Sequence, residues 1–557
     1  MTKARISRRE FTVAAAGATL LPAASSPRQL WADTRTSHLG APSPDGKLLS
    51  IVDPATGDLA VRETATGAVR RLTRNPAGSP EFAYFSVFSR DGRQIAYAWY
   101  NRERIYELRT IGVDGNGMRV LHSHPERRFV QPCAWTADGK RILTLFFRGD
   151  NVSQIALVEA GSGKVDVLKS LDWIYPNRMD LSPDGKWIAY DDLIREGDSR
   201  RTIHLLATDG STHRTLLKAP SGETFPLFAP SGDAVTYLRG GTIYRYDLRQ
   251  PGPERMLHAV GQALPMGFTR GGDYYYAVRN NQFALQIADF DAAPGPGRPY
   301  SASLPVINAA PSWSADGKRI AFLARAANEN FGQESRIIVI REVDGNAGTV
   351  LPPRLAHTGW VRWMPDGKAL LAGGSDRHGQ RGLYRIDIAS GDATPLVREP
   401  AETYDGFEGL PSGPTEAVYL QGSQLRKTGA DAPLYAAPAG RLHSLTADRD
   451  QLYFVLETAA STDILAFDGR IRRLAFWKGD PILGLEASPD SLIALTKEAL
   501  WRIPLAAGSP ERLPWKLTPG ALPRFAPGGK RLAWISGSAR TEIWVAERLL
   551  DVADHQR

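Results

Sequence analysis

The sequence contains 557 residues, with a formal net charge of +8, 42% hydrophobic residues and 23% charged residues. This length exceeds that of one ordinary core, and the composition is typical of a soluble globular protein. No run of lysine and arginine is dense enough for a nucleic-acid-binding patch, so that class of partner is excluded. Cys133 is the only cysteine, which excludes an intramolecular disulfide and a multi-cysteine metal site.

The N-terminal segment predicts an export signal. Ser7-Arg8-Arg9-Glu10-Phe11 precedes an apolar run from Thr12 to Leu21 and small residues at positions 23–25. This run is too short for a permanent membrane span. The segment resembles Tat signal peptides, which implies export of a folded protein to the periplasm. We therefore predict a signal peptide and leader over residues 1–32, cleaved between residues 25 and 32; the alternative is an N-terminal helix with a chance arginine pair.

The rest of the chain repeats one hairpin, whose clearest copy is Leu181-Ser182-Pro183-Asp184-Gly185-Lys186-Trp187-Ile188-Ala189-Tyr190. Pro183 fixes its own φ, and Asp184-Gly185 permits the positive φ that a tight turn requires. Strand-forming residues on both sides of such a turn predict a β-hairpin. Similar turns recur at Asp45-Gly46, Asp91-Gly92, Asp138-Gly139, Asp316-Gly317 and Asp366-Gly367, with weaker copies near residues 232, 272, 412, 449, 490 and 528.

The period of roughly 40 residues predicts a repeat architecture. In one unit, strands are expected at 132–135, 141–147, 154–159 and 164–168, with no helical period between units. Four antiparallel strands per unit predict an all-β protein built of β-propeller blades, here named a to d from the inside outward. About twelve blades exceed one ordinary ring, so two tandem rings of about six blades each are predicted.

The boundary between the rings is expected at Ala293-Pro294-Gly295-Pro296-Gly297-Arg298-Pro299, which has no strand character. The predicted domains are therefore residues 33–298 and 299–557. The alternative is a long loop within one large ring. The tail beyond Glu547 is expected to form a last outer strand or a short helix, or the N-terminal stretch completes the ring instead.

The Ser-Pro-Asp-Gly-Lys turn followed by Ile188-Ala189-Tyr190 resembles the propeller repeats of TolB and of the N-terminal domains of prolyl oligopeptidase and dipeptidyl-peptidase proteins. This resemblance covers nearly everything after the signal and is specific for fold rather than function. A resemblance to TolB implies a periplasmic protein-binding role. The sequence departs from both groups, because it has neither the α/β domain of TolB nor the α/β-hydrolase domain of the peptidases.

Motifs of common enzyme classes are missing from the sequence. It contains no Gly-x-Ser-x-Gly elbow, no phosphate-binding loop and no His-Glu-x-x-His. Serine-peptidase activity is therefore not expected, and neither a cofactor nor a metal is predicted. We predict instead a periplasmic, non-catalytic protein that binds a protein or a cell-envelope component. The alternative is a propeller-type polysaccharide lyase or hydrolase acting on acidic glycans.

The binding site is predicted on one face of the discs. The a–b and c–d turns share one face, which we call the turn face; the b–c and d–a connections share the other, the loop face. The b–c loops are long and dissimilar, and function on rigid scaffolds concentrates in such loops. Aromatic and charged residues are the expected anchors. The candidates are Trp99, Tyr100, Arg102, Arg104, Arg148, Asp150, Asp191, Asp192, Arg195, Glu329, Asp376, Arg377, His378 and His357.

Two subsets of these candidates leave alternatives open. Adjacent carboxylates such as Asp191-Asp192 point to opposite faces of a strand, which disfavours a shared cation. His357 and His378 fall on the same face and are compatible with acid–base chemistry or a metal. Ordinary solvated loop residues are the alternative interpretation of every candidate.

Overall fold

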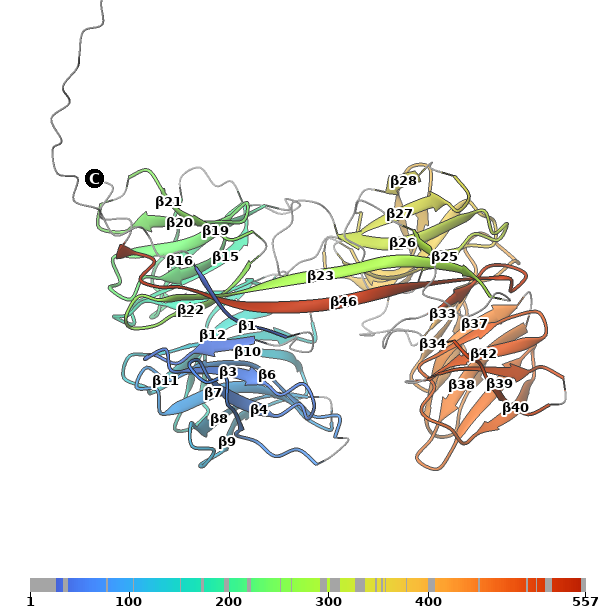
Figure 1. The fold of residues 1–557 in the computed structure, drawn as a ribbon, viewed down its shortest axis with the longest axis horizontal. Coiled ribbons are helices and arrows are strands. Elements are labelled where there is room, and N and C mark those ends of the chain that lie inside the picture. The colour runs from blue at the N-terminus through green and yellow to red at the C-terminus, as the bar shows by residue number, and fades with distance from the viewer. Residues whose placement is uncertain are drawn as a thin grey trace, which may run out of the picture.

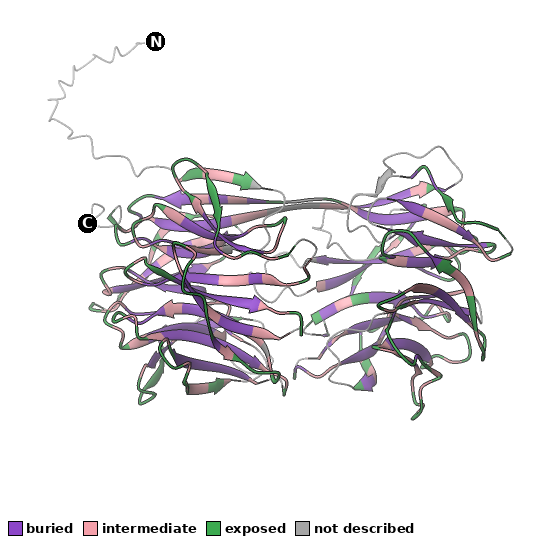
Figure 2. Cartoon of the chain, turned by 90° about the horizontal axis from the view of Figure 1, so that it is seen from below, coloured by how far each residue is buried: buried purple, intermediate pink, exposed green. Residues whose placement is uncertain are grey.

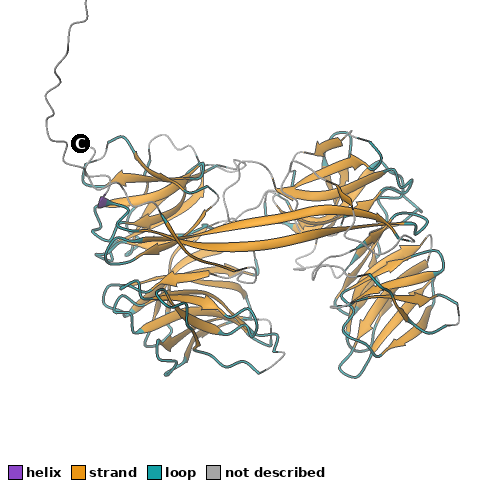
Figure 3. Cartoon of the chain, in the orientation of Figure 1, coloured by secondary structure: helices purple, strands orange, loops and turns teal. Residues whose placement is uncertain are grey.

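The computed structural model describes residues 27–33 and 39–551, apart from gaps at 77–78, 104, 151, 172–174, 195–199, 218–221, 251, 262, 291–297, 301–310, 326–335, 346–347, 352–353, 356, 377, 399–405, 449–450, 497–498, 507 and 516–522. The described residues form strands and turns, and the only helical piece among them is the short one near residue 551 that Figure 3 draws in purple. They make ten four-stranded antiparallel sheets and one six-stranded sheet. The predicted all-β class is therefore confirmed.

The repeated turn explains why each hairpin forms. Ser182 Oγ donates to Asp184 Oδ1 at 2.6 Å and accepts a hydrogen bond from Trp187 N at 2.9 Å. Asp184 Oδ1 also accepts from Lys186 N at 3.1 Å, and Gly185 has a φ of +73°. The serine hydroxyl and the aspartate thus satisfy the backbone donors that a tight turn leaves without partners. The same bonds recur in the turns that begin at Ser43, Ser89, Thr136 and Ser314.

Five complete blades belong to the first ring (Figure 1, blue to green). Their strands are β2 (Leu39–Pro42), β3 (Leu48–Val52), β4 (Leu59–Glu63) and β5 (Val69–Arg71); β6 (Phe82–Phe88), β7 (Gln94–Tyr100), β8 (Tyr106–Gly112) and β9 (Arg119–Ser123); β10 (Arg127–Trp135), β11 (Arg141–Arg148), β12 (Ser153–Glu159) and β13 (Val165–Leu171); β14 (Met179–Leu181), β15 (Trp187–Leu193), β16 (Arg201–Ala207) and β17 (His213–Thr215); β18 (Thr224–Phe228), β19 (Ala234–Arg239), β20 (Thr242–Asp247) and β21 (Arg255–Ala259).

Five complete blades belong to the second ring (Figure 1, yellow to orange). Their strands are β25 (Ser312–Trp313), β26 (Arg319–Arg325), β27 (Arg336–Glu342) and β28 (Gly348–Leu351); β29 (His357–Trp363), β30 (Ala369–Ser375), β31 (Arg381–Asp387) and β32 (Ala393–Arg398); β33 (Phe407–Gly409), β34 (Ala417–Gln421), β35 (Gln424–Lys427) and β36 (Tyr435–Ala436); β37 (Arg441–Asp448), β38 (Gln451–Glu457), β39 (Thr462–Phe467) and β40 (Ile471–Trp477); β41 (Gly484–Ala487), β42 (Ser491–Leu495), β43 (Leu500–Pro504) and β44 (Glu511–Arg512).

The six-stranded sheet supplies the sixth blade of both rings. Its two central strands, β23 (Tyr274–Asp289) and β46 (Arg531–Ala546), are each 16 residues long and pair antiparallel from end to end. Near one end they pair with β22 (Ala263–Phe268) and β1 (Arg28–Asp33), which completes the first ring. Near the other end they pair with β24 (Arg298–Tyr300) and β45 (Arg524–Phe525), which completes the second ring. In Figure 1 this ribbon spans both rings.

The contacts between inner strands close both rings. In the first ring, neighbouring inner strands touch in the cyclic order β2, β6, β10, β14, β18, β22 and back to β2. In the second ring the order is β25, β29, β33, β37, β41, β45 and back to β25. The described residues therefore form two six-bladed propellers, as predicted.

The hydrophobic core lies between adjacent blades rather than in one central mass. One cluster joins Leu59 and Val61 of the first blade to Ile95 and Tyr97 of the second, and each is 2% exposed or less. Similar clusters follow around both rings, which Figure 2 shows as buried strand centres with exposed turns. Each blade can bury its apolar faces only against its neighbours, as in other repeat architectures.

Two sequence expectations need correction. Arg298 and Pro299 were assigned to a linker but lie in β24, because the backbone of residues 298–300 pairs with residues 285–287. Residues 28–32 were assigned to a leader but lie in β1, which is the outer strand of a blade. The alternative that the N-terminal stretch completes a ring is therefore confirmed. Residues 1–26 and 552–557 lie outside the described residues, and the domain limits 33–298 and 299–557 remain predictions.

Candidate functional site

The ribbon turns the loop faces of the two rings toward each other. Strand β23 serves the first ring as a b strand, so it leaves that ring at the loop face. It then enters the second ring as a c strand, again at the loop face. Strand β46 runs the opposite way with the same roles, since it is b in the second ring and c in the first. The loop faces are thus the inner faces of the pair, and the turn faces are the outer faces.

Half-buried aromatic side chains gather on the loop face of the first ring. We call Tyr84, Phe85, Tyr100, Tyr106, Phe129 and Tyr175 the aromatic cluster. Ring centroids lie 4.9 Å apart for Tyr100 and Tyr106, 5.4 Å for Tyr106 and Phe129, and 6.2 Å for Phe129 and Tyr175. These residues come from strands β6, β7, β8 and β10 and from the d–a connection before β14. Such spacing allows edge-to-face and tilted packing and leaves part of each ring accessible.

One member of the aromatic cluster is subject to a charge of the second ring. Burial raises the pKa of the Tyr175 hydroxyl, and the positive charges of Arg201 and Arg381 oppose that shift. Arg381 is the first residue of β31 in the second ring, so its charge reaches a side chain of the first. Burial also raises the pKa of Tyr84, and Arg279 opposes that shift. Both phenols therefore stay neutral at pH 7 and carry a proton to donate.

The backbone is strained beside the aromatic cluster. Phe85 has a φ of +26° and Phe225 a φ of +55°, values that residues with a Cβ atom rarely adopt. Both lie where the pairing register shifts in inner strands β6 and β18. They line a cavity of about 120 Å³ on the ring axis, together with Tyr84, Asn177 and Arg279. Strain of this kind persists where the surroundings enforce it and often marks functional positions.

The described candidates from the sequence fall into two groups. Tyr100, Arg102, Arg148, Asp150, Asp192, Asp376, His378 and His357 are exposed or half-buried on the loop faces. Arg148 Nη2 lies 2.8 Å from Asp150 Oδ2, and Arg102 Nε lies 3.6 Å from Glu81 Oε1. Among the candidates, only Tyr100 is a member of the aromatic cluster. Arg104, Arg195, Glu329 and Arg377 lie outside the described residues.

Trp99 and Asp191 belong to the interior, which corrects their assignment to the binding surface. Trp99 is 3% exposed, because it packs between the first two blades with the Arg109 guanidinium over its ring at 4.7 Å. Asp191 is fully buried and accepts hydrogen bonds from Arg201 Nη1 at 3.2 Å and Asn177 Nδ2 at 2.8 Å. Successive side chains of a strand point to opposite faces. Trp99 and Asp191 therefore point inward, whereas the residues that follow them, Tyr100 and Asp192, point outward.

The histidine candidates do not form a metal site with neighbouring ligands. His357 begins β29 and pairs with Ser375, just before the loop that carries His378. In that loop Asp376 Oδ1 accepts hydrogen bonds from the backbone of His378 and Gln380, at 2.9 Å and 3.0 Å. Within the part of the chain that the structure describes, no three His, Cys, Asp or Glu residues gather closely enough to hold a metal ion.

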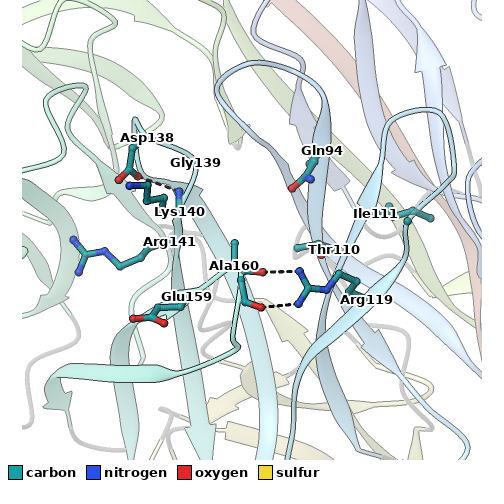
Figure 4. Close-up of a pocket in the computed structure, with 12 residues that line it drawn as sticks. Gln94, Thr110, Ile111, Arg119, Asp138, Gly139, Lys140, Arg141, Glu159 and Ala160 are labelled. Carbon is teal, nitrogen blue, oxygen red and sulfur yellow. Dashed lines mark hydrogen bonds between the residues drawn. The ribbon is translucent and has the colours of Figure 1, made fainter.

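Two further hollows lie toward the turn face of the first ring. One, of about 540 Å³, lies between its second and third blades (Figure 4). Arg119 spans it and donates to the carbonyls of Ala160 and Gly161 at 3.3 Å and 2.6 Å, so its guanidinium joins one blade to the next. The other, of about 260 Å³, lies on the ring axis and receives side chains from all six blades. No helix among the described residues is long and apolar enough to cross a membrane.

Several solved structures are distantly similar to this chain. Neither a protein-family model nor a curated protein matches the sequence. Among solved structures, TolB from Acinetobacter baumannii is 17% identical over 60% of this chain and 74% of that chain, with a TM-score of 0.27. An oligogalacturonate lyase in complex with manganese is 15% identical over 65% and 90%, with a TM-score of 0.33. The tricorn protease is 11% identical over 86% and 58%, with a TM-score of 0.31. At these identities the similarity concerns the fold and not an activity.

Proposed function

We propose that the protein is an exported, non-catalytic binding protein of the periplasm. Its ligand is a protein or a cell-envelope component, held by the loop face of the first ring. The observation that carries this proposal is the aromatic cluster, because its rings remain partly accessible on a face that looks toward the second ring. Partly buried Tyr and Phe side chains of this kind are typical anchors of binding surfaces.

The neighbouring charges restrict the ligand further. Arg279 lines the axial cavity beside Tyr84, and Arg381 lies within electrostatic reach of Tyr175. A ligand that combines flat or apolar groups with negative charge would contact both kinds of side chain. Acidic polypeptide segments meet this description, and so do acidic glycans of the envelope. Binding without reaction is the simpler proposal, because no three possible metal ligands gather among the described residues and the sequence contains no Gly-x-Ser-x-Gly elbow.

Capture from an envelope extract tests this proposal. The full-length protein is immobilised and compared with the variants Phe129→Ala and Tyr175→Ala, which remove two members of the aromatic cluster. Phe476→Ala is the matched control, because Phe476 is 48% exposed on the outer strand β40 of the second ring. We expect the captured ligand to be reduced at least tenfold for the first two variants, since a hot-spot aromatic contributes about 2 kcal/mol or more. Equal capture by all four proteins would rule out the proposed surface.

An activity assay separates the proposal from the enzyme alternative. The protein is incubated with polygalacturonate, with and without manganese, and the absorbance of unsaturated sugar products is followed. We expect no product above the buffer control. Product formation that His357→Ala or His378→Ala abolishes would replace the binding protein by a lyase.

A further inference from the structure

The axial cavity on the turn face of the first ring has apolar walls. Its volume is about 260 Å³, and it lies on the opposite side of the ring from the aromatic cluster. The walls are formed by Phe88, Trp135, Leu181, Phe228, Met266 and Phe268, which come from five different blades. Five of these side chains are less than 10% exposed, and Phe268 is half-buried. A cavity of this size is smaller than most drug-sized ligand sites, so it would accept a small organic molecule.

The rim of this cavity departs from the repeat at two positions. In five of the six a–b turns of this ring, the second residue of the turn lines the cavity. Four of the six are Pro44, Ala137, Pro183 and Pro230, and the equivalent positions at 315, 365, 489 and 527 of the second ring are also proline or alanine. Within the first ring, the turns of the second and sixth blades instead place a large cation there, namely Arg90 and Arg270. The fold does not require these cations, since its other turns form without them.

The arginines at the rim are held in place by backbone carbonyls. Arg90 Nη2 donates to Leu181 O at 3.1 Å and to Ser182 O at 3.3 Å, so the side chain reaches across from the second blade to the fourth. Arg270 Nη2 donates to the carbonyl of Arg90, and Arg270 N donates to Pro44 O at 2.8 Å. Among the described residues, no carboxylate lies within 4.0 Å of either guanidinium.

A third cation forms the floor of the cavity. Arg178 lines both axial cavities and donates Nη1 to Pro265 O at 3.0 Å and Nη2 to Met266 O at 2.9 Å. Its Nε atom is buried, and within the described residues it has no hydrogen-bond partner. Arg178 therefore contributes its positive charge to the cavity, and that charge attracts a negatively charged group across a short distance in a poorly solvated environment. The nearby acid is Asp180, whose pKa is raised by burial and which accepts a hydrogen bond from Phe228 N at 2.8 Å.

We propose that this cavity binds a small organic carboxylate whose apolar body lies against Trp135, Phe88 and Phe228 and whose negative charge is held by Arg90, Arg270 and Arg178. Three guanidinium groups face one carboxyl group, so the cavity carries an excess of positive charge among apolar walls. Burial among apolar walls strengthens the attraction between an arginine and a carboxylate. This site does not rest on the proposed function, because it lies on the other face of the ring and uses other residues.

Calorimetric titration of the full-length protein tests the site. The probes are phenylacetate and hexanoate, and the matched control is phenylacetamide, which has nearly the same shape as phenylacetate without its charge. We expect at least one carboxylate to bind and the amide to bind at least tenfold more weakly, because a hydrogen bond to a charged group discriminates by about that factor or more. Affinity is also expected to fall as salt is added, since the rim is open to solvent.

Three variants locate the binding. Arg270→Gln and Arg90→Gln are each expected to weaken carboxylate binding about tenfold. Arg93→Gln is the matched control, because Arg93 lies in the same turn as Arg90 but is exposed and does not line the cavity. Arg270 is exposed at the rim, so its substitution keeps the test valid if the Arg90 variant does not fold. Failure of both carboxylates to bind, equal binding of acid and amide, or equal loss in the Arg93 variant would overturn the proposal.

Discussion

The blades that close the two rings share the long strands β23 and β46. The strand that is inner in one ring is outer in the other. In the first ring, β22 and the first half of β23 form the inner strands, and the second half of β46 and β1 form the outer strands. In the second ring, β45 and the first half of β46 are inner, and the second half of β23 and β24 are outer. The first ring therefore depends on three distant parts of the chain, and the second depends on two.

This comparison shows that the two propellers are not independent units. Each contributes one long strand to the other, and the same 16-residue ladder stabilises both. Domains joined by a flexible linker unfold separately, whereas a shared ladder couples them. The end strands still differ, since β1 and β22 have six residues each whereas β45 has two and β24 three. Four measurements test this coupling and the differences between the rings.

Breaking the ribbon is expected to have the largest effect. Ala277 is fully buried in β23, between Leu264 of β22 and Ile543 of β46. Ala277→Pro removes a backbone donor and places a ring in a central strand, so we expect a loss of about 3 kcal/mol or more in the free energy of unfolding. Urea denaturation followed by circular dichroism measures it. A loss below about 1 kcal/mol would show that the ribbon does not hold the first ring closed.

Cavities at the two ends of the ribbon test the coupling directly. Ile543 packs in the first ring and Ile535 in the second, and both are 2% exposed or less. Ile543→Ala and Ile535→Ala are each expected to cost about 2–4 kcal/mol, because each leaves an unfilled space in a packed core. Both should shift one common transition, whether it is followed by tryptophan fluorescence or by circular dichroism. Two separate transitions would mean that the rings unfold independently.

Acid is expected to lower the stability of the protein through two histidines of the first ring. Burial lowers the pKa of His122 and of His204, both in the first ring, from 6.5 to about 4. The folded state therefore binds fewer protons than the unfolded state below pH 6.5, so stability falls as the pH is lowered from 6.5 toward 4. Denaturation midpoints measured across this range should slope less steeply for His122→Gln and His204→Gln. His378→Gln is the comparison variant, because it changes an exposed histidine of the second ring.

The smallest effect is expected from completing the repeat at its turns. Ala137 and Ala315 occupy the turn position where Pro44, Pro183 and Pro365 stand in other blades, and both alanines are exposed. Ala137→Pro and Ala315→Pro should each stabilise by about 0.4–1 kcal/mol, because proline restricts the unfolded chain and fits this backbone conformation. Thermal denaturation should show a similar increase in melting temperature for either variant. A decrease would mean that these two turns differ from the other copies.

The blades could be predicted because the residues that form each hairpin lie close together in the sequence. In the best-kept copies a Ser-x-Asp-Gly or Thr-x-Asp-Gly turn fixes the hairpin through hydrogen bonds within a few residues, so the number of turns predicts the number of blades. The ribbon was not predictable in this way. Pairing between residues 274–289 and 531–546 joins segments far apart in sequence, and neither segment identifies its partner. Strand β1 was assigned to a leader for the same reason, since only pairing with β46 shows its role.

The site was predictable in part. Tyr100, an aromatic residue predicted from a long b–c loop, is a member of the aromatic cluster, while the binding role of the loop face stays a prediction. Trp99 and Asp191 were assigned to the surface because the end of strand b, and with it the side chains that turn inward, was not located. Tyr84, Phe129 and Tyr175 are not among the predicted residues, although aromatic residues within the first three positions of an inner strand or shortly before it are a usable signal. The sequence places Arg90 and Arg270 at the second turn position, but only the structure brings them to one cavity.

The ribbon also dictates when the protein can fold during its synthesis. The guanidinium of Arg28 donates a hydrogen bond to Glu547 at 3.4 Å, across a sequence separation of 519 residues. Neither ring can close until residues 531–546 have left the ribosome, because both rings need β46. The ten other blades can form earlier, but until β46 is available they make two incomplete rings. The unpaired strand edges of such rings are prone to aggregation. A nascent chain of this kind is expected to need a chaperone until its last segment emerges.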